Sequence, residues 1–391
     1  MPCSRNAPEC LYRVAAVAAA CLLSTALAGC SPPETAAANG QTVAVGLVTT
    51  ALSGDGTAEE PEAQAMAWYL ETRPLTDAGT RVELVVEDDG GTVAGLQKAL
   101  RRLAGRQDLA VVVSFAPSDR LLRVVETVNE LGLPVIAAVA TNPNVVRSTD
   151  LVSLLSFDDR FQGQVAALYA RNELGLERAA VFTLPESRYA QFLAGQFRAE
   201  LENEGGRIVH WKDLESDGPP LAKAVAEARE AGAQMLYLAL DQELSLAAVE
   251  TVASIGWSPV IMVSDGVLAA WIRHFPDRLE DADGVIGTDL YAPGMYLPPA
   301  GEALLERYAR RGRPVGTHAV LALEAAELLR NVMGRCGQVP HRSCVQARLR
   351  ETGDFVGALG KIGFTTEGLA ERPIVINRLR DGAREFVVRV Y

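Results

Sequence analysis

Apolar and polar residues follow one another along the chain in a repeated order: a short apolar run, then a longer stretch with helical spacing. In the first half, the runs TVAVGLVT, RVELVVED, LAVVVSF and LPVIAAV are rich in β-branched residues and mostly continuous, as buried parallel strands are. A helix is predicted at 59–72. The clearest helical stretch precedes LPVIAAV, where one face carries Leu121, Val124, Val125, Val128 and Leu131. This order predicts a parallel sheet covered by helices on both faces.

A second series with the same order follows. Its predicted strands are RAAVFTL, RIVHW, QMLYLAL and SPVIMVS, and its predicted helices cover residues 161–172, 189–204, 221–231 and 244–255. Two more helices are expected at 300–311 and 319–333, and the tail predicts a hairpin that turns at Asp381-Gly382. Two such series in a chain of 391 residues, larger than a usual single core, predict two α/β domains with similar sheets.

The N-terminus has the features of an export signal. Two arginines precede an apolar run, Val14–Ala28, which is too short for a transmembrane helix but suits a signal peptide. The run ends in LAGC, which resembles the lipobox of bacterial lipoproteins and implies cleavage before Cys30 and a lipid on its sulfur. We therefore expect a signal peptide at 1–29 and a lipidated tether at 30–41. The alternative is an ordinary secretory signal that is cut elsewhere.

Charge and cysteine content narrow the function. A net charge of −12 argues against a nucleic-acid partner, which would require a basic face. If the signal is removed and Cys30 is lipidated, the cysteines that remain are Cys336 and Cys344. In an oxidising, exported compartment we expect them to form a disulfide, and two free thiols are the alternative.

Motifs for catalysis or cofactor binding are missing from the sequence. It contains no glycine-rich phosphate loop after a strand and no G-x-S-x-G elbow. Its four histidines are scattered, without the spacing of a metal site. We therefore predict no cofactor, no metal and no enzymatic activity.

Short polar residues instead follow several predicted strands. Ser118, Thr141 and Asp265 come shortly after predicted parallel strands, at the carboxyl ends outside which ligands of open α/β sheets bind. Hydroxyls could donate to a carboxylate, and Asp265 could accept from an ammonium group. Each residue also has a structural explanation as a helix cap or a turn residue.

Six segments together resemble one family, the Leu/Ile/Val-binding type of periplasmic substrate-binding proteins that serve ABC importers. They are VAVGLVTTALSG, EDDGGTVAGLQKALRRL, ELGLPVIAAVATNPN, SFDDRFQGQVAALYA, ASIGWSPVIMVSDGV and DFVGALGKIGFTTEGLAERPIVI, and they occur in the family's order. The resemblance implies the type I periplasmic binding fold, two doubly wound parallel-sheet lobes joined by a three-crossing hinge. We expect residues 42–156 plus 291–350 in lobe 1 and residues 157–290 plus 351–391 in lobe 2.

The resemblance also implies roles for residues. Ser118 matches the residue that holds a ligand carboxylate, and the segment Val139, Ala140 and Thr141 matches the one that holds carboxylate and ammonium. Tyr189 matches an aromatic of the second lobe that packs over the ligand, and Asp265 matches the acidic residue that takes the ammonium.

Two further positions depart from the family. Asp241 stands where amino-acid binders often have tyrosine, and His318 falls roughly where an aromatic can wall the side-chain pocket. If Asp241 and Asp265 both face the cleft, their charge favours a basic or amide-bearing ligand. The alternative is a solvated Asp241 at the start of a helix.

The resulting hypothesis is a lipid-anchored protein of the cell envelope that faces the periplasm, on either the inner or the outer membrane. It captures an amino acid or a similar small polar ligand between its lobes and delivers it to an ABC permease in the inner membrane. The alternative is a lipoprotein of the same fold that acts through protein contacts, in cell-wall synthase activation or ligand sensing. An enzyme that uses the cleft is the third possibility.

Overall fold

The computed structural model describes residues 42–50, 60–73, 80–214 and 221–391, and all of them belong to one compact unit. The predicted signal peptide, the tether and the anchor Cys30 lie outside the described residues. Within the part of the chain that the structure describes, no helix is both long enough and apolar enough to cross a membrane.

The first lobe is built on a sheet of five parallel strands in the order β2-β1-β3-β4-β5. The strands are β1 (Thr42–Thr49), β2 (Arg81–Asp88), β3 (Leu109–Ser114), β4 (Val135–Ala137) and β5 (Val152–Leu154). The helices of this lobe are α1 (Pro61–Thr72), α2 (Val93–Ala104), α3 (Ser118–Leu122), α4 (Val125–Leu131), α10 (Pro299–Ala309), α11 (Thr317–Gly334) and α12 (Arg342–Arg350). The first four strands confirm the predicted runs, and β5 is too short to give a periodic signal.

The stretch predicted as one amphipathic helix forms two. α3 ends at Leu122 and α4 begins at Val125, with Val124 at φ −119° and ψ 4° between them. Leu121, Val124, Val125 and Val128 are nevertheless all buried. Because the broken helix also satisfies the apolar spacing, periodicity alone could not reveal the break.

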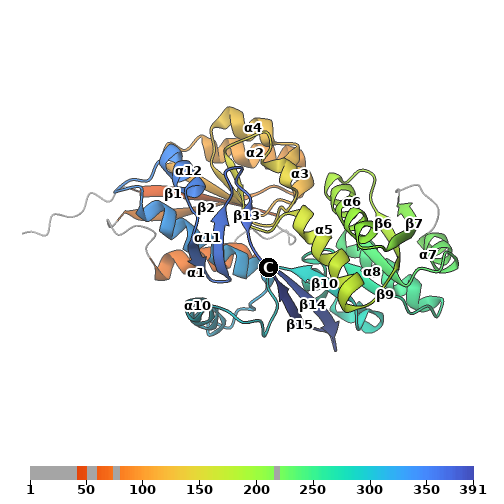
Figure 1. The fold of residues 1–391 in the computed structure, drawn as a ribbon. Helices are drawn as coiled ribbons and strands as arrows, with labels where there is room; N and C mark the ends of the chain where they lie inside the picture. The colour runs from red at the N-terminus through yellow and green to blue at the C-terminus, as the bar shows by residue number, and fades with distance from the viewer. Residues whose placement is uncertain (1–41, 51–59, 74–79, 215–220) are drawn as a thin grey trace, which may run out of the picture. The chain divides into compact units, whose positions relative to one another are not determined.

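The second lobe is built on a seven-stranded sheet in the order β15-β14-β10-β9-β8-β6-β7. Its strands are β6 (Arg178–Thr183), β7 (Arg207–Asp213), β8 (Met235–Ala239), β9 (Val260–Val263), β10 (Ile286–Asp289), β14 (Ile374–Arg380) and β15 (Ala383–Val390). Strands β6 to β10 run parallel, and β14 pairs antiparallel with β10, as Figure 1 shows. The helices are α5 (Asp159–Leu168), which continues into a π-helical turn (Tyr169–Glu173), α6 (Arg188–Asn203), α7 (Leu221–Glu230), α8 (Gln242–Ser254) and α9 (Val267–His274).

The C-terminal hairpin confirms the sequence prediction. Asp381 and Gly382 have φ values of 50° and 71°, and a two-residue hairpin turn of type I′ requires positive φ at both positions. The turn therefore fixes the register in which β15 pairs with β14 at the edge of the second sheet.

The boundary between the lobes near the C-terminus differs from the prediction. Residues from 351 onward were expected in lobe 2, but β11 (Phe355–Gly357), β12 (Gly360–Phe364) and β13 (Ala370–Glu371) attach to lobe 1. Leu154 of β5 bridges to Leu369, and Glu324 of α11 accepts a hydrogen bond from the Leu359 amide at 3.0 Å. The predicted boundary is therefore wrong for this segment, and the chain crosses to lobe 2 just before β14.

A buried ion pair explains where that crossing lies. The Arg372 guanidinium is 3.0 Å from the Glu324 carboxylate and also donates to the Leu155 carbonyl, and both charged side chains are almost fully buried. Removing either charge would leave the other buried without its counter-charge, so the pair ties this crossing to lobe 1.

A disulfide joins Cys336, just after α11, to Cys344 in α12, with the two Cα atoms 5.8 Å apart. The bond closes the short connection between the two helices and lies in lobe 1, on the pair of cysteines that the sequence singled out.

Candidate ligand-binding site

The loops that follow β3 and β4 meet through one buried hydroxyl. Ser118 Oγ accepts hydrogen bonds from the backbone amides of Thr141 and Asn142, both at 3.1 Å. These bonds occupy the acceptor positions of the hydroxyl and leave its proton to donate. Ser118 is not the cap of α3, because the capping position is Pro117. The structure thus brings together Ser118 and the predicted segment that contains Val139, Ala140 and Thr141.

Two residues predicted for the site on the second lobe also meet. Asp265 follows β9, and its Oδ1 accepts from the Tyr189 hydroxyl at 2.7 Å and from Gln162 Nε2 at 2.9 Å. Burial raises the pKa of Asp265 to about 6, although both hydrogen bonds oppose the shift. Burial also raises the pKa of Tyr189 well above its ordinary value, and the negative charge of Asp265 raises it further.

A second carboxylate, which the sequence analysis missed, lies in the same place. Asp159 is the first residue of α5 and is completely buried, and its amide donates to the Thr141 carbonyl at 3.0 Å. Neither carboxylate oxygen has a partner with hydrogen-bond geometry among the described residues, although the nearby Thr141 side chain acts to lower the pKa of Asp159. Burial, reinforced by the charge of Asp265, raises the pKa of Asp159 well above its ordinary value. An available signal was the Asp-Asp pair in SFDDRFQ: Asp158 alone caps α5, which leaves Asp159 for another role.

Other unpartnered polar atoms accompany these carboxylates. Gln162 Oε1 and the Tyr237 hydroxyl are both buried and have no partner among the described residues. Burial raises the pKa of Tyr237, and the charges of Asp159 and Asp265 raise it further. In the described chain neither Asp159 nor Asp265 forms an ion pair with Lys, Arg or His. The structure therefore assembles an acidic cluster, defined as Asp159, Asp265, Tyr189, Tyr237 and Gln162, which no cationic side chain of the described residues neutralises.

Asp241 and His318 form no hydrogen bond with a residue of this acidic cluster in the described chain. Asp241 is exposed and caps α8, where its Oδ1 accepts from the Leu244 amide at 2.8 Å. His318, near the start of α11, packs its ring on Phe115 with centroids 5.4 Å apart, and its Nδ1 lies 3.1 Å from the Glu62 carboxylate. His318 thus sits beside the ends of first-lobe strands, with its side chain about half exposed.

Direct contacts between the lobes surround these residues. Asp119 accepts hydrogen bonds from the Ser187 hydroxyl and the Tyr189 amide, and Asn142 donates to the Arg188 carbonyl. At another point, Arg273 of α9 forms an ion pair of 2.9 Å with Glu60, next to α1. Residues from both sheets' strand ends therefore come together between the lobes, as the position of ligand sites in α/β sheets leads one to expect.

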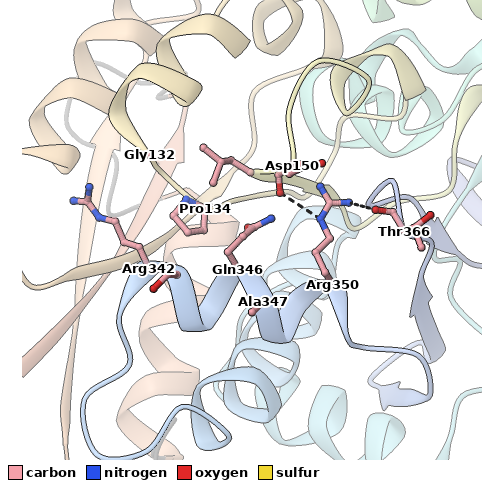
Figure 2. A pocket seen from close by; sticks show the side chains of 10 residues that line it. Gly132, Pro134, Asp150, Arg342, Gln346, Ala347, Arg350 and Thr366 are labelled. Carbon is pink, nitrogen blue, oxygen red and sulfur yellow. Dashed lines mark hydrogen bonds between the residues drawn. The ribbon is translucent and has the colours of Figure 1, made fainter.

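A pocket of about 620 Å³ lies elsewhere, between α12 and the loops around Pro134 and Asp150. Figure 2 shows Arg342 and Arg350 at its two sides, with Gln346 between them on the same helix. Arg350 donates to the backbone carbonyls of Asp150, Val152 and Thr366, and Arg342 donates to four other carbonyls. These guanidinium groups fasten α12 to the backbone around it, so their donors are already engaged.

The described residues contain no group of three or more His, Cys, Asp or Glu side chains placed to hold a metal ion. The model of the periplasmic binding protein family matches residues 42–383. The chain belongs to this family. No curated protein sequence matches the chain closely enough to count as a relative.

Solved structures of periplasmic binding proteins share the fold. A leucine binding protein of Thermotoga maritima has 22% identity and a TM-score of 0.78, with 90% of this chain and 98% of that chain covered. A branched-chain amino acid binding protein of Streptococcus pneumoniae in complex with isoleucine has 20% identity and a TM-score of 0.76, covering 89% and 99%. A solute binding protein of Rhodopseudomonas palustris in complex with 3,4-dihydroxybenzoic acid has 16% identity and a TM-score of 0.76, covering 89% and 97%. At these identities the likeness establishes the two-lobe architecture.

Proposed function

We propose that the protein is an extracytoplasmic solute-binding protein that captures an α-amino acid, or a similar small zwitterion, between its lobes and delivers it to an ABC importer. The observation that carries this proposal is the acidic cluster next to the Ser118 loop. The charge of Asp265 makes ionisation of Asp159 more costly, and no cationic side chain of the described residues pairs with either carboxylate.

A buried carboxylate without a partner binds either a proton or a cation, because the bare charge is costly away from water. An ammonium group supplies three donors to a site that offers both oxygens of Asp159, the Gln162 carbonyl and the Tyr237 hydroxyl. The Ser118 hydroxyl, with its acceptor positions filled, is suited to donate to a carboxylate. An ammonium acceptor and a carboxylate donor linked through Thr141 together match the two ends of an α-amino acid.

The ligands of the structural relatives fall into two chemical classes, amino acids and aromatic acids. Relatives have been solved with isoleucine and leucine, and others with 3,4-dihydroxybenzoic acid and benzoate. A benzoate carries a carboxylate but no ammonium, so it would add a further negative charge beside Asp159 and Asp265. The charge of Asp159 and Asp265 therefore favours the amino-acid class.

The mechanism we propose is a shift between open and closed arrangements of the lobes. A ligand that contacts the Ser118 loop of lobe 1 and Asp265 of lobe 2 stabilises the closed arrangement by the difference in its affinity for the two. We further propose that Cys30 carries a lipid anchor and that residues 30–41 tether the lobes to the membrane near the permease. No covalent chemistry is part of this function.

Isothermal titration calorimetry of the purified protein tests the proposal with L-leucine, L-isoleucine, L-glutamine, L-lysine, benzoate and 3,4-dihydroxybenzoate. We expect at least one amino acid to bind and both benzoates to fail. Asp159→Asn should weaken amino-acid binding by about 30-fold or more, since a charge-assisted hydrogen bond contributes about 2 kcal/mol. Asp281→Asn, which changes an exposed carboxylate of lobe 2, is the matched control. If the wild-type protein binds a benzoate and none of the four amino acids, the proposal is refuted.

A further inference from the structure

Two loops of lobe 1 share an arrangement that the ligand site alone does not explain. In each loop, a residue predicted to contact the ligand is followed by one that reaches across to lobe 2. Ser118 is followed by Asp119, and Thr141 is followed by Asn142. The first members are tied together through the Ser118 hydroxyl, so both second members are held in fixed positions.

Asp119 binds the start of a helix that belongs to the other lobe. Its Oδ2 accepts from the Ser187 hydroxyl at 2.5 Å, and its Oδ1 accepts from the Tyr189 amide at 3.1 Å. Ser187 is the N-cap of α6, and its hydroxyl also accepts from the Ala190 amide at 3.0 Å. The carboxylate thus supplies negative charge at the positive end of α6, which is a favourable placement.

Asn142 binds the same segment from the other loop. Its Nδ2 donates to the Arg188 carbonyl at 3.3 Å, while its Oδ1 accepts from the Asn144 amide at 3.0 Å and so fixes the orientation of the side chain. Three consecutive residues, 187 to 189, are therefore held by two side chains of lobe 1.

The segment so held also reaches the acidic cluster. Tyr189 is bonded to Asp119 through its amide and to Asp265 through its hydroxyl, at 3.1 and 2.7 Å. A displacement of the start of α6 away from lobe 1 would therefore move the tyrosine hydroxyl that hydrogen-bonds Asp265. Closure of the lobes and assembly of the acidic cluster are mechanically connected through this one residue.

We propose that Asp119 and Asn142 form a latch that holds the start of α6 against lobe 1 and so sets how strongly the lobes close around a ligand. This inference rests on the proposed function in taking closure as the step that traps the ligand. Both are positioning residues, since every bond that defines the latch joins protein atoms. The apparent affinity of a binding protein is its intrinsic affinity scaled by the fraction that is competent to bind, so a weaker latch lowers affinity without a change in ligand contacts.

The latch can be tested without a ligand. Nitroxide labels on the exposed positions Glu130→Cys in lobe 1 and Glu230→Cys in lobe 2 report the distance between the lobes by double electron–electron resonance. Asp119→Ala should lower the ratio of closed to open molecules by about 5- to 30-fold, the range for loss of a helix-capping side chain. Asn142→Ala should lower the ratio of closed to open molecules less, because this substitution removes one uncharged bond across the lobes. Asp119→Asn should lower the ratio less than Asp119→Ala does.

Thr92→Ala is the matched control. The Thr92 hydroxyl caps α2 by accepting from the Gly95 amide at 3.0 Å, entirely within lobe 1, so its loss should leave the distances between the lobes unchanged. Circular dichroism melting checks that each variant is folded. An unchanged distance distribution in folded Asp119→Ala would overturn the latch, and so would a wild-type protein with no closed population.

A second measurement separates this inference from the proposed function. With L-leucine, L-isoleucine, L-glutamine and L-lysine as probes, Asp119→Ala should speed dissociation of whichever amino acid binds by about 5- to 30-fold. If none of the four binds the wild-type protein, the proposed function fails while the distance measurement still decides the latch. If an amino acid binds and dissociates from Asp119→Ala at the wild-type rate, the latch fails and the proposed function stands.

Discussion

Replacement of Asp265 by asparagine separates the charge of the acidic cluster from its shape. The amide oxygen of asparagine can still accept from the Tyr189 hydroxyl and from Gln162, so the change removes mainly the negative charge. At neutral pH the wild-type protein must keep this carboxylate ionised in a place where burial disfavours the charge. We therefore expect Asp265→Asn to be more stable than the wild type when no ligand is present.

The size of the effect follows from the pKa. Burial raises the pKa of Asp265 from 3.8 to about 6, and each unit corresponds to about 1.4 kcal/mol, which gives about 3 kcal/mol in the free energy of unfolding. A carboxyl group whose pKa is raised by folding favours the folded state fully below about pH 4, and this contribution is lost as the pH rises through about 6. The variant and the wild type should thus be equally stable at pH 4, and the variant should gain up to about 3 kcal/mol by pH 7.5. Opening of the lobes hydrates the carboxylate, so this value is an upper limit.

Urea unfolding at half-unit steps between pH 4 and pH 7.5, with the ligand removed, measures this difference. Asp281→Asn, an exposed carboxylate in the same lobe, is the control and should track the wild type at every pH. A difference between Asp265→Asn and wild type that stays constant with pH would refute the reasoning, since the gain would then come from something other than ionisation. A stability difference that shrinks as the pH rises would mean that folding lowers the pKa of Asp265 instead of raising it.

Three further outcomes are expected. Arg372→Met should destabilise the protein by about 3–5 kcal/mol in urea unfolding, because it leaves Glu324 buried without its cation. The double variant Glu324→Gln with Arg372→Met should recover part of that loss. Equal stability of the single and double variants would contradict a coupled pair. The double variant Cys336→Ser with Cys344→Ser should lose about 2–3 kcal/mol of stability in thermal unfolding, because the disulfide no longer closes its short loop, and it should keep its amino-acid affinity. An unchanged melting temperature would show that the disulfide does not stabilise the protein. Asp241→Asn should leave amino-acid affinity unchanged in calorimetry, because its exposed carboxylate caps α8; a large loss would place Asp241 in contact with the ligand after all.

Much of the candidate site was already visible as residue types at strand ends. Ser118 and Thr141 follow strands of the first sheet and Asp265 follows a strand of the second, and ligands of α/β sheets bind at the carboxyl ends of such strands. The structure joins Ser118 to Thr141, and Tyr189 to Asp265, while their contacts to a ligand stay a prediction. What the pattern could not supply was the partner of each polar group.

The residues that the sequence analysis missed show why. Asp159 is the second acidic residue of SFDDRFQ, and only the packing of α5 leaves its carboxylate without a partner among the described residues. Asp119 follows Ser118 in the sequence, but its partners lie 68 and 70 positions away at the start of α6. The run 351–371 was assigned to the wrong lobe, because the Glu324–Arg372 pair that fixes it joins distant parts of the chain.

The sequence by itself determined the local elements: nearly every long strand and helix, the hairpin turn at Asp381-Gly382, and the two α/β series. It could do so because apolar spacing and turn residues report which face of a segment is buried. Only the tertiary structure decided which loops meet. It thereby decided that two carboxylates lie together with no cationic partner among the described residues, and that Asp119 binds the opposite lobe. Electrostatic cost and hydrogen-bond partnership depend on distance and burial in space, and these are set by the packing of segments far apart in the chain.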